Sequence, residues 1–119
     1  MKAQLQYRLV KFASQIVNID KNLKPCLGSR HLYAQILRSA TSAALNYGEA
    51  QTAESRKDFI HKLGVTLKEL KETEVNLEVI LESGIYKEEQ PIEGALKECR
   101  ELIAIFMVTR RTARENNNE

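Results

Sequence analysis

Five polar side chains share one face of a predicted helix near the middle of the chain. In sequence order, this polar stripe consists of Gln35, Arg38, Ser42, Asn46 and Glu49. Steps of three and four residues bring side chains to the same side of an α-helix. An ordinary solvated face is rich in Lys and Glu, whereas the stripe carries two amides, a guanidinium, a hydroxyl and a carboxylate. The pattern favours either a structural hydrogen-bond ladder or a ligand site, in which Arg38 is best suited to hold a phosphate or carboxylate.

A second candidate site is a basic face on the next predicted helix. Because a helix N-terminus favours acidic groups, basic side chains in its first turn oppose the helix dipole slightly. The face is either an ordinary solvated surface or a patch that contacts phosphates, and oligomerisation would strengthen the patch by placing several copies side by side. Together with one arginine of the polar stripe, the predicted nucleic-acid contacts are Arg38, Arg56, Lys57, His61, Lys68 and Lys71.

One carboxylate falls where apolar side chains are expected. Glu74 shares a helix sector with leucines, so it must find a partner or shift its pKa. We expect Arg38 or Asn46 to supply that partner, which would add Glu74 to a structural polar network with the stripe. A buried structural pair is favoured over catalysis.

Two spacings resemble those of enzymes, and both are weak. Asp58 and His61 have the carboxylate-x-x-His spacing of di-iron bundles, but that site needs two such motifs and further carboxylates. Arg56 and His61 fit a loose Arg-x₄₋₆-His pattern of helical ribonucleases, in which the histidine acts as an acid or base. We therefore expect no enzyme activity, catalytic residue, metal site or cofactor. A metal-independent ribonuclease using Arg56 and His61 is the less favoured alternative.

The composition excludes several classes of protein. Of 119 residues, 43% are hydrophobic and 29% are charged, which indicates one folded domain and no membrane partner. No run approaches the roughly 18 apolar residues that span a bilayer, and residues 1–10 lack the apolar core of a signal peptide. Cys26 and Cys99 lack metal-type spacing, so we expect reduced thiols in a cytoplasmic protein rather than a bridge between them.

Hydrophobic periodicity predicts four helices that position these candidate residues. Ser29 is the expected N-cap of the second helix, and Ser55 with Asp58 resembles a capping box at the start of the third. Gly84 is well suited to the position directly after the end of the third helix. Short connections between long helices imply an all-α, antiparallel up-down-up-down four-helix bundle. The predicted helices cover residues 3–19, 30–49, 56–83 and 92–114.

The predicted bundle is a single domain covering residues 1–115, followed by a disordered polar tail over 116–119. The fourth helix contains an unbroken apolar run over 102–108, which exceeds the single stripe that a bundle core covers. Ile105 or Val108 would then be exposed to water, so we expect this helix to pack against another subunit. Arg110, Arg111 and Arg114 are interpreted first as charges that suit a helix C-terminus and only second as nucleic-acid contacts.

Combined motifs give the chain a resemblance to a known family. The motifs are Gln35-Ile36-x-Arg38-x-Ala40 with Ser42, Asn46-x-x-Glu49, Ser55-Arg56-Lys57-Asp58-Phe59-Ile60-x-x-Leu63, Glu72-x-Glu74 and Gly84-Ile85-Tyr86. Over nearly its whole length the chain resembles the four-helix-bundle proteins encoded in intervening sequences of 23S rRNA genes. The resemblance implies an up-down bundle that assembles into a homopentamer.

A distant relative of that family is the accessory protein of diversity-generating retroelements, a basic pentamer that binds nucleic acid and a reverse transcriptase. The resemblance therefore implies RNA or DNA, and a nucleic-acid enzyme, as partners. The chain departs from the family pattern at residues 46–50 and at His61, where Arg or Lys is usual, and these changes with the low net charge argue against strong binding. We predict a non-enzymatic homo-oligomer that interacts with nucleic acid, most of all RNA. The main alternative is a protein-interaction scaffold without nucleic acid.

Overall fold

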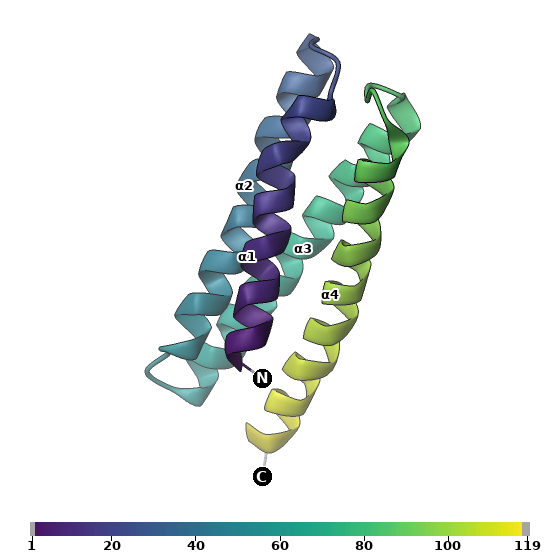
Figure 1. Cartoon of the computed structure of the whole chain (residues 1–119). Helices are drawn as coiled ribbons and strands as arrows, with labels where there is room; N and C mark the ends of the chain where they lie inside the picture. The colour runs from purple at the N-terminus through teal and green to yellow at the C-terminus, as the bar shows by residue number, and fades with distance from the viewer. Residues whose placement is uncertain (1, 118–119) are drawn as a thin grey trace.

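The computed structural model describes residues 2–117 and contains four long helices with one short 3₁₀ turn (Figure 1). The four predicted helices and the bundle fold are confirmed. No helix among residues 2–117 is long and apolar enough to cross a membrane. In chain order the elements are α1 (Lys2–Asn18), η1 (Ile19–Asn22), α2 (Leu27–Gln51), α3 (Arg56–Ser83) and α4 (Glu89–Asn117).

Each helix runs back along the one before it, so both chain ends lie at one end of the bundle (Figure 1). The end contacts agree with this path. The Tyr33 hydroxyl near the start of α2 donates to the Val17 carbonyl near the end of α1, at 2.7 Å. At the opposite end, Lys62 near the start of α3 lies 3.2 Å from Glu49 near the end of α2. The bundle is therefore a long rod, with extents of 51 × 21 × 20 Å.

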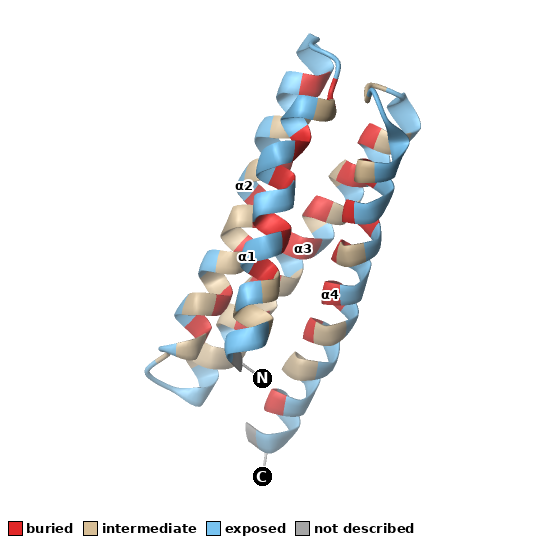
Figure 2. Cartoon of the chain, in the orientation of Figure 1, coloured by how far each residue is buried: buried red, intermediate tan, exposed pale blue. Residues whose placement is uncertain are grey.

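The core runs the length of the rod, where apolar side chains at helical spacing meet (Figure 2). At the centre of α2 the small residues Ser39, Ala40 and Ala43 are fully buried, and α2 with α3 forms the most extensive helix pair. The buried Ser39 and Thr73 hydroxyls lie 2.6 Å apart and share one hydrogen bond, and each also lies within hydrogen-bond distance of a carbonyl of its own helix, Ile36 at 3.3 Å and Glu69 at 2.9 Å. α1 and α4 contact each other much less than the other neighbouring pairs. The bundle is thus most loosely closed at the seam between its first and last helices.

Helix ends were predicted well on α3 and poorly on α2. The Ser55 hydroxyl accepts a hydrogen bond from the Asp58 N–H at 3.0 Å, and Gly84 ends α3 in the left-handed region at φ 71°, both as predicted. The second bond of the predicted capping box, from the Ser55 N–H to the Asp58 side chain, does not form among the described residues. The predicted N-cap at Ser29 is wrong, because α2 begins at Leu27 after Cys26. The Cys26 sulfur accepts from the Ser29 N–H at 3.3 Å, while the Ser29 hydroxyl accepts from the Cys26 N–H at 3.0 Å.

The fourth helix is longer at both ends than predicted. It starts at Glu89, so Pro91 lies in the first turn. A proline is tolerated there because a backbone N–H in the first turn has no partner within the helix. It continues to Asn117, so residues 116–117 of the predicted tail are helical, and residues 118–119 lie outside the described part. Both cysteines are free, as predicted: Cys26 is exposed and Cys99 is buried.

Candidate nucleic-acid interface

The outer face of α3 carries the predicted row of basic side chains. Lys57, His61, Lys68 and Lys71 are all exposed, and their spacing places them on one side of the helix. Only Lys68 has a carboxylate within 4.0 Å among the described residues, and that ion pair with Glu72 is long, at 3.9 Å. An exposed pair of this kind contributes little. The row therefore presents positive charge that the fold itself leaves largely uncompensated.

A fifth cation reaches this row from α4. The Nε of Arg110 donates to the carbonyl of Ile60 at 3.3 Å, and its guanidinium lies directly over Gly64. A Cβ added to Gly64 would lie 2.9 Å from both Nε and Nη2 of Arg110, closer than ordinary contact allows. The glycine thus leaves room for the guanidinium on the α3 backbone. Arg110 has no carboxylate within 4.0 Å among residues 2–117, so it adds a further uncompensated charge.

We call the five cations of this surface the basic face. Four of them lie on α3 and one on α4, and the central position is the arginine seated over the glycine. Its members are Lys57, His61, Lys68, Lys71 and Arg110.

Arg56 lies apart from the basic face. Its guanidinium carbon is 5.6 Å from the centre of the Phe59 ring, which is a cation–π contact. Arg56 and His61 are five residues apart on α3, so their side chains diverge by about 140° around the helix axis. A histidine acid or base must reach the atom of the substrate with which it exchanges a proton, so a second group that takes part has to face the same place. The arrangement gives the Arg56 and His61 pair no shared centre.

Arg38 of the polar stripe is held by two carboxylates of α3. Its Nη1 donates to Glu69 and its Nη2 to Glu72, both at 2.8 Å. The Glu69 side chain is only 6% exposed, so this contact supplies the charge partner that a buried carboxylate needs. Burial works to raise the pKa of Glu69, but Glu72, Ser42 and Arg38 outweigh it and hold that pKa below its ordinary value. Arg38 therefore joins α2 to α3, and its charge is already matched.

The rest of the stripe forms separate short contacts rather than one ladder. The Asn46 amide donates to the carbonyl and the hydroxyl of Ser42, at 2.9 and 3.1 Å. Glu49 pairs with Lys62 at 3.2 Å. Gln35 makes no side-chain hydrogen bond among the described residues and is exposed. Most of the stripe thus stabilises its own helix or its contact with α3.

The predicted partner of Glu74 is wrong. Glu74 is half-buried and pairs with Arg100 of α4 at 3.1 Å, not with Arg38 or Asn46. The reason is position around α3, since Glu74 faces α4 whereas Glu69 and Glu72 face α2. The buried carboxylate that Arg38 compensates is Glu69. Arg38 thus does form the expected pair with a buried carboxylate of α3, but the carboxylate is Glu69 and not Glu74.

No group of three or more His, Cys, Asp or Glu side chains that could hold a metal ion occurs within residues 2–117. Asp58 and His61 therefore have no third such side chain beside them in the described part of the chain, and His61 is exposed. The described residues therefore offer surface charge rather than a coordination site.

Comparison with known proteins identifies the family. The family model of the 23S rRNA-intervening sequence protein matches residues 2–111. This chain belongs to that family. It is also similar to a crystal structure of a protein of unknown function from the S23 ribosomal protein family of Bacteroides thetaiotaomicron. That similarity has 34% identity and a TM-score of 0.78, and covers 93% of this chain and 99% of the other. No curated protein matches the chain.

Membership of the 23S rRNA-intervening sequence protein family confirms the resemblance inferred from the motifs, whereas the relation to retroelement accessory proteins stays a prediction. The main group that sequence reasoning underrated in this family member is Arg110, which we interpreted first as a charge suited to the end of a helix. Its contact with Ile60 joins residues 50 apart in sequence. The one available signal was Gly64 in the middle of a long helix. A glycine there lowers helix stability, so its presence suggests that another group packs closely against the backbone.

Proposed function

We propose that this protein is a non-enzymatic, homo-oligomeric RNA-binding protein whose contact surface is the basic face. The observation that supports this most directly is the packing of the Arg110 guanidinium against Gly64, which adds an uncompensated charge to the row on α3. A cation that the protein leaves unpaired can release counterions when it meets a phosphate, and that release is the main source of affinity for nucleic acid. A cation already bound to carboxylates contributes far less.

The same argument separates the predicted contacts into two groups. Lys57, Lys71 and Arg110 have no carboxylate within 4.0 Å among the described residues, so they are the strongest phosphate contacts. Arg38 is occupied by Glu69 and Glu72, and we assign it a structural role. The family is named after 23S rRNA intervening sequences, and RNA is the ligand that we propose to test first.

Self-association is supported by apolar side chains that the single chain leaves exposed on its outer surface. On α4, Val108 is 54% and Met107 is 47% exposed, and on α3 Val75 is 57% exposed. Both residues on α4 lie in the apolar run that a single bundle cannot cover. Packing that surface against further copies would bring several basic faces together, so modest charge per chain would add up. The same surface favours the second candidate function, a protein-interaction scaffold.

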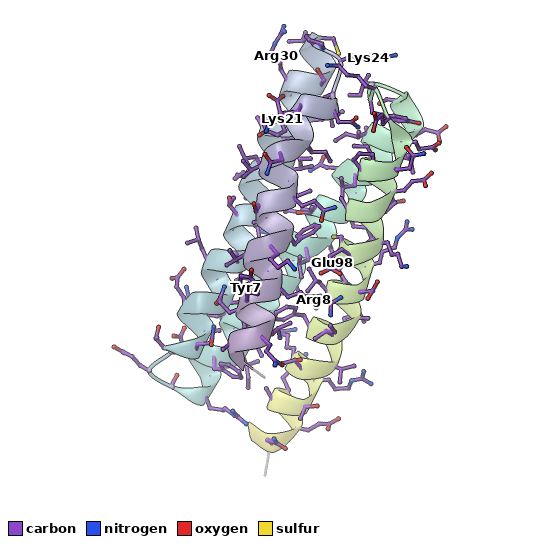
Figure 3. All side chains as sticks on the ribbon, in the orientation of Figure 1. Tyr7, Arg8, Lys21, Lys24, Arg30 and Glu98 are labelled. Atoms are coloured by element: carbon purple, nitrogen blue, oxygen red, sulfur yellow. The ribbon has the colours of Figure 1, made fainter. Side chains whose placement is uncertain are left out.

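Fluorescence anisotropy with a short labelled RNA, measured between about 50 and 200 mM salt, tests the proposal. One triple variant replaces Lys57, Lys71 and Arg110 by alanine. The matched control replaces three cations at the far end of the rod by alanine, namely Lys21, Lys24 and Arg30 (Figure 3). Both variants lose the same formal charge, so a difference between them reports position rather than net charge.

We expect steep salt dependence for the wild type, loss of binding for the basic-face variant, and nearly unchanged binding for the control. Equal losses in both variants would mean that the attraction is unspecific. No binding at the lowest salt would refute RNA binding and leave the scaffold as the better proposal. Light scattering on the same samples measures the oligomer, and a monomer at micromolar concentration would remove self-association from the proposal.

A further inference from the structure

A pocket of about 510 Å³ opens in the seam between α1 and α4, near the N-terminal end of α1. Its walls and floor come from all four helices, and most of its lining is apolar. Leu5 and Arg8 of α1 face Ile105 and Thr109 of α4, while Tyr47 of α2 and Phe59 of α3 line it from below. Sites for small molecules typically measure about 300 to 1,000 Å³ and combine apolar walls with a few placed polar groups.

The decisive polar group is the hydroxyl of Tyr47. The residue is only 3% exposed, and its ring packs edge-on against Phe106 with centroids 5.1 Å apart. Its hydroxyl makes no hydrogen bond to any described residue. Every fully enclosed side-chain nitrogen or oxygen in the described part of the chain has a partner. The unpartnered hydroxyl must therefore occupy the small accessible edge of Tyr47, and the pocket is the cavity that this residue lines.

The protonation state of Tyr47 makes it a hydrogen-bond donor. Burial raises the pKa of Tyr47, so at neutral pH the phenol keeps its proton and can donate a hydrogen bond. A ligand that fills the pocket displaces the water at this edge and must replace its hydrogen bond, or binding loses that energy. The hydroxyl can also accept a hydrogen bond, but its proton is left unpaired unless the ligand places an acceptor atom over the ring edge of Tyr47.

The cation at the rim does not call for an anionic ligand. Arg8 donates to both oxygens of Glu98, at 2.7 and 2.8 Å, and to Glu101 at 3.1 Å. Figure 3 shows Arg8 and Glu98 meeting across the seam between α1 and α4. These carboxylates compensate the charge of the guanidinium, and the ion pair also joins the two pocket walls. The pocket is therefore formed in advance and is close to neutral in charge.

We propose that this pocket binds a small, neutral, largely apolar molecule that accepts a hydrogen bond from Tyr47. The apolar walls supply affinity, and the buried donor supplies selectivity for molecules with a carbonyl oxygen or a ring nitrogen. The site lies in the seam between α1 and α4, whereas the basic face lies on the outer surface of α3 with Arg110 of α4, and the inference does not depend on RNA binding.

Two probes of the same size test the inference. Acetophenone carries a carbonyl acceptor, and ethylbenzene has nearly the same shape without one. Each is titrated into protein with labelled Leu and Ile methyl groups, and the NMR shifts of Leu5 and Ile105 report binding. Tyr47→Phe removes the hydroxyl but keeps the ring against Phe106. Ile105→Trp fills the pocket, and its control is Val17→Trp, an exposed site at the other end of α1.

We expect both probes to saturate the wild type, with acetophenone binding about tenfold more tightly, which corresponds to one net hydrogen bond. Tyr47→Phe should remove that preference, Ile105→Trp should abolish binding, and Val17→Trp should change neither. Equal affinity of the two probes for the wild type would overturn the proposal, as would saturable binding that survives Ile105→Trp. If the Leu5 and Ile105 methyls respond to protein dilution and to neither probe, a second copy covers the pocket and the proposal is wrong.

Discussion

Replacing Gly64 by alanine should weaken RNA binding while leaving the stability of the protein nearly unchanged. Alanine in a helix interior is favoured over glycine by about 0.5 to 1 kcal/mol. Against this, the new Cβ would lie 2.9 Å from two guanidinium nitrogens, so the guanidinium of Arg110 must shift, and we expect it to lose its 3.3 Å hydrogen bond to Ile60. A bond of this kind contributes about 0.5 to 1.5 kcal/mol. The two effects are opposite in sign and similar in size, so the melting temperature should hardly move.

The loss of affinity follows from the number of phosphate contacts. Each contact changes the logarithm of the binding constant by about 0.7 per decade of salt for a single strand and about 0.9 for a duplex. At about 0.1 M salt, one decade below the 1 M reference, losing one contact costs about fivefold for a single strand and about eightfold for a duplex. The slope of the salt dependence should fall by the same 0.7 to 0.9, roughly. Gly64→Ala should therefore lower the affinity and reduce the salt slope by these amounts for each subunit that contacts the RNA.

Arg110→Ala completes a double-mutant cycle, measured by anisotropy for binding and by denaturant unfolding for stability. If the glycine acts only by seating the arginine, Gly64→Ala should cost no further affinity in the Arg110→Ala background. Gly94→Ala on α4 is the matched control, because the nearest side-chain atom to its added Cβ is 3.9 Å away. That variant should gain stability and bind as the wild type does. The reasoning is refuted if Gly64→Ala behaves like Gly94→Ala, or if its loss persists without Arg110.

Three further outcomes follow from buried and exposed groups. Cys26 should react readily with iodoacetamide near neutral pH, because hydrogen bonds from Ser29 lower its pKa, whereas Cys99, with a pKa raised by burial to about 12, should react only after unfolding; mass spectrometry of peptides separates them, and equal rates would contradict this. Thr73→Val should destabilise by about 0.5 to 1.5 kcal/mol because it removes the 2.6 Å hydrogen bond between the buried hydroxyls and leaves Ser39 only its 3.3 Å contact with the Ile36 carbonyl, and adding Ser39→Ala should cost less than the same change does in the wild type, as measured by denaturant unfolding. Val108→Lys should reduce the mass measured by light scattering without unfolding the chain, since the residue is 54% exposed in the monomer, and an unchanged oligomer would place the subunit contact elsewhere.

The elements of the fold were predictable because local signals and hydrophobic period agree over most of the chain. Ser55 and Gly84 are strong cap residues, and the structure uses both as predicted. Cys26 was missed because sulfur is a weak acceptor and a cysteine is not among the preferred N-caps, so Ser29 three residues later gave the stronger signal. Pro91 was treated as a barrier although a first-turn proline is compatible with a helix. These errors move helix ends but do not alter the bundle.

The contacts of the candidate site were less predictable, because the choice of partner depends on rotation about the helix axis. Glu74 and Glu69 both lie on inward-facing parts of α3, and the sequence alone does not say which of them faces α2. A difference of five residues is about 140° of rotation, which decides between Arg38 and Arg100 as the partner. The non-enzymatic role, the oligomer and the cytoplasmic location stay predictions.

The polar stripe and the basic face therefore divide the cations of this protein by whether the fold compensates them. Arg38 suited phosphate recognition by its chemistry, yet two carboxylates at 2.8 Å already compensate its charge, so a phosphate gains less from it. Arg110 looked like an ordinary helix-end charge, yet it rests on the α3 backbone with no carboxylate in reach among residues 2–117. A phosphate gains most from a cation that is already positioned and still unpaired. By that criterion the arginine seated over Gly64 carries the proposed function, and the polar stripe mainly holds α2 against the helix that presents it.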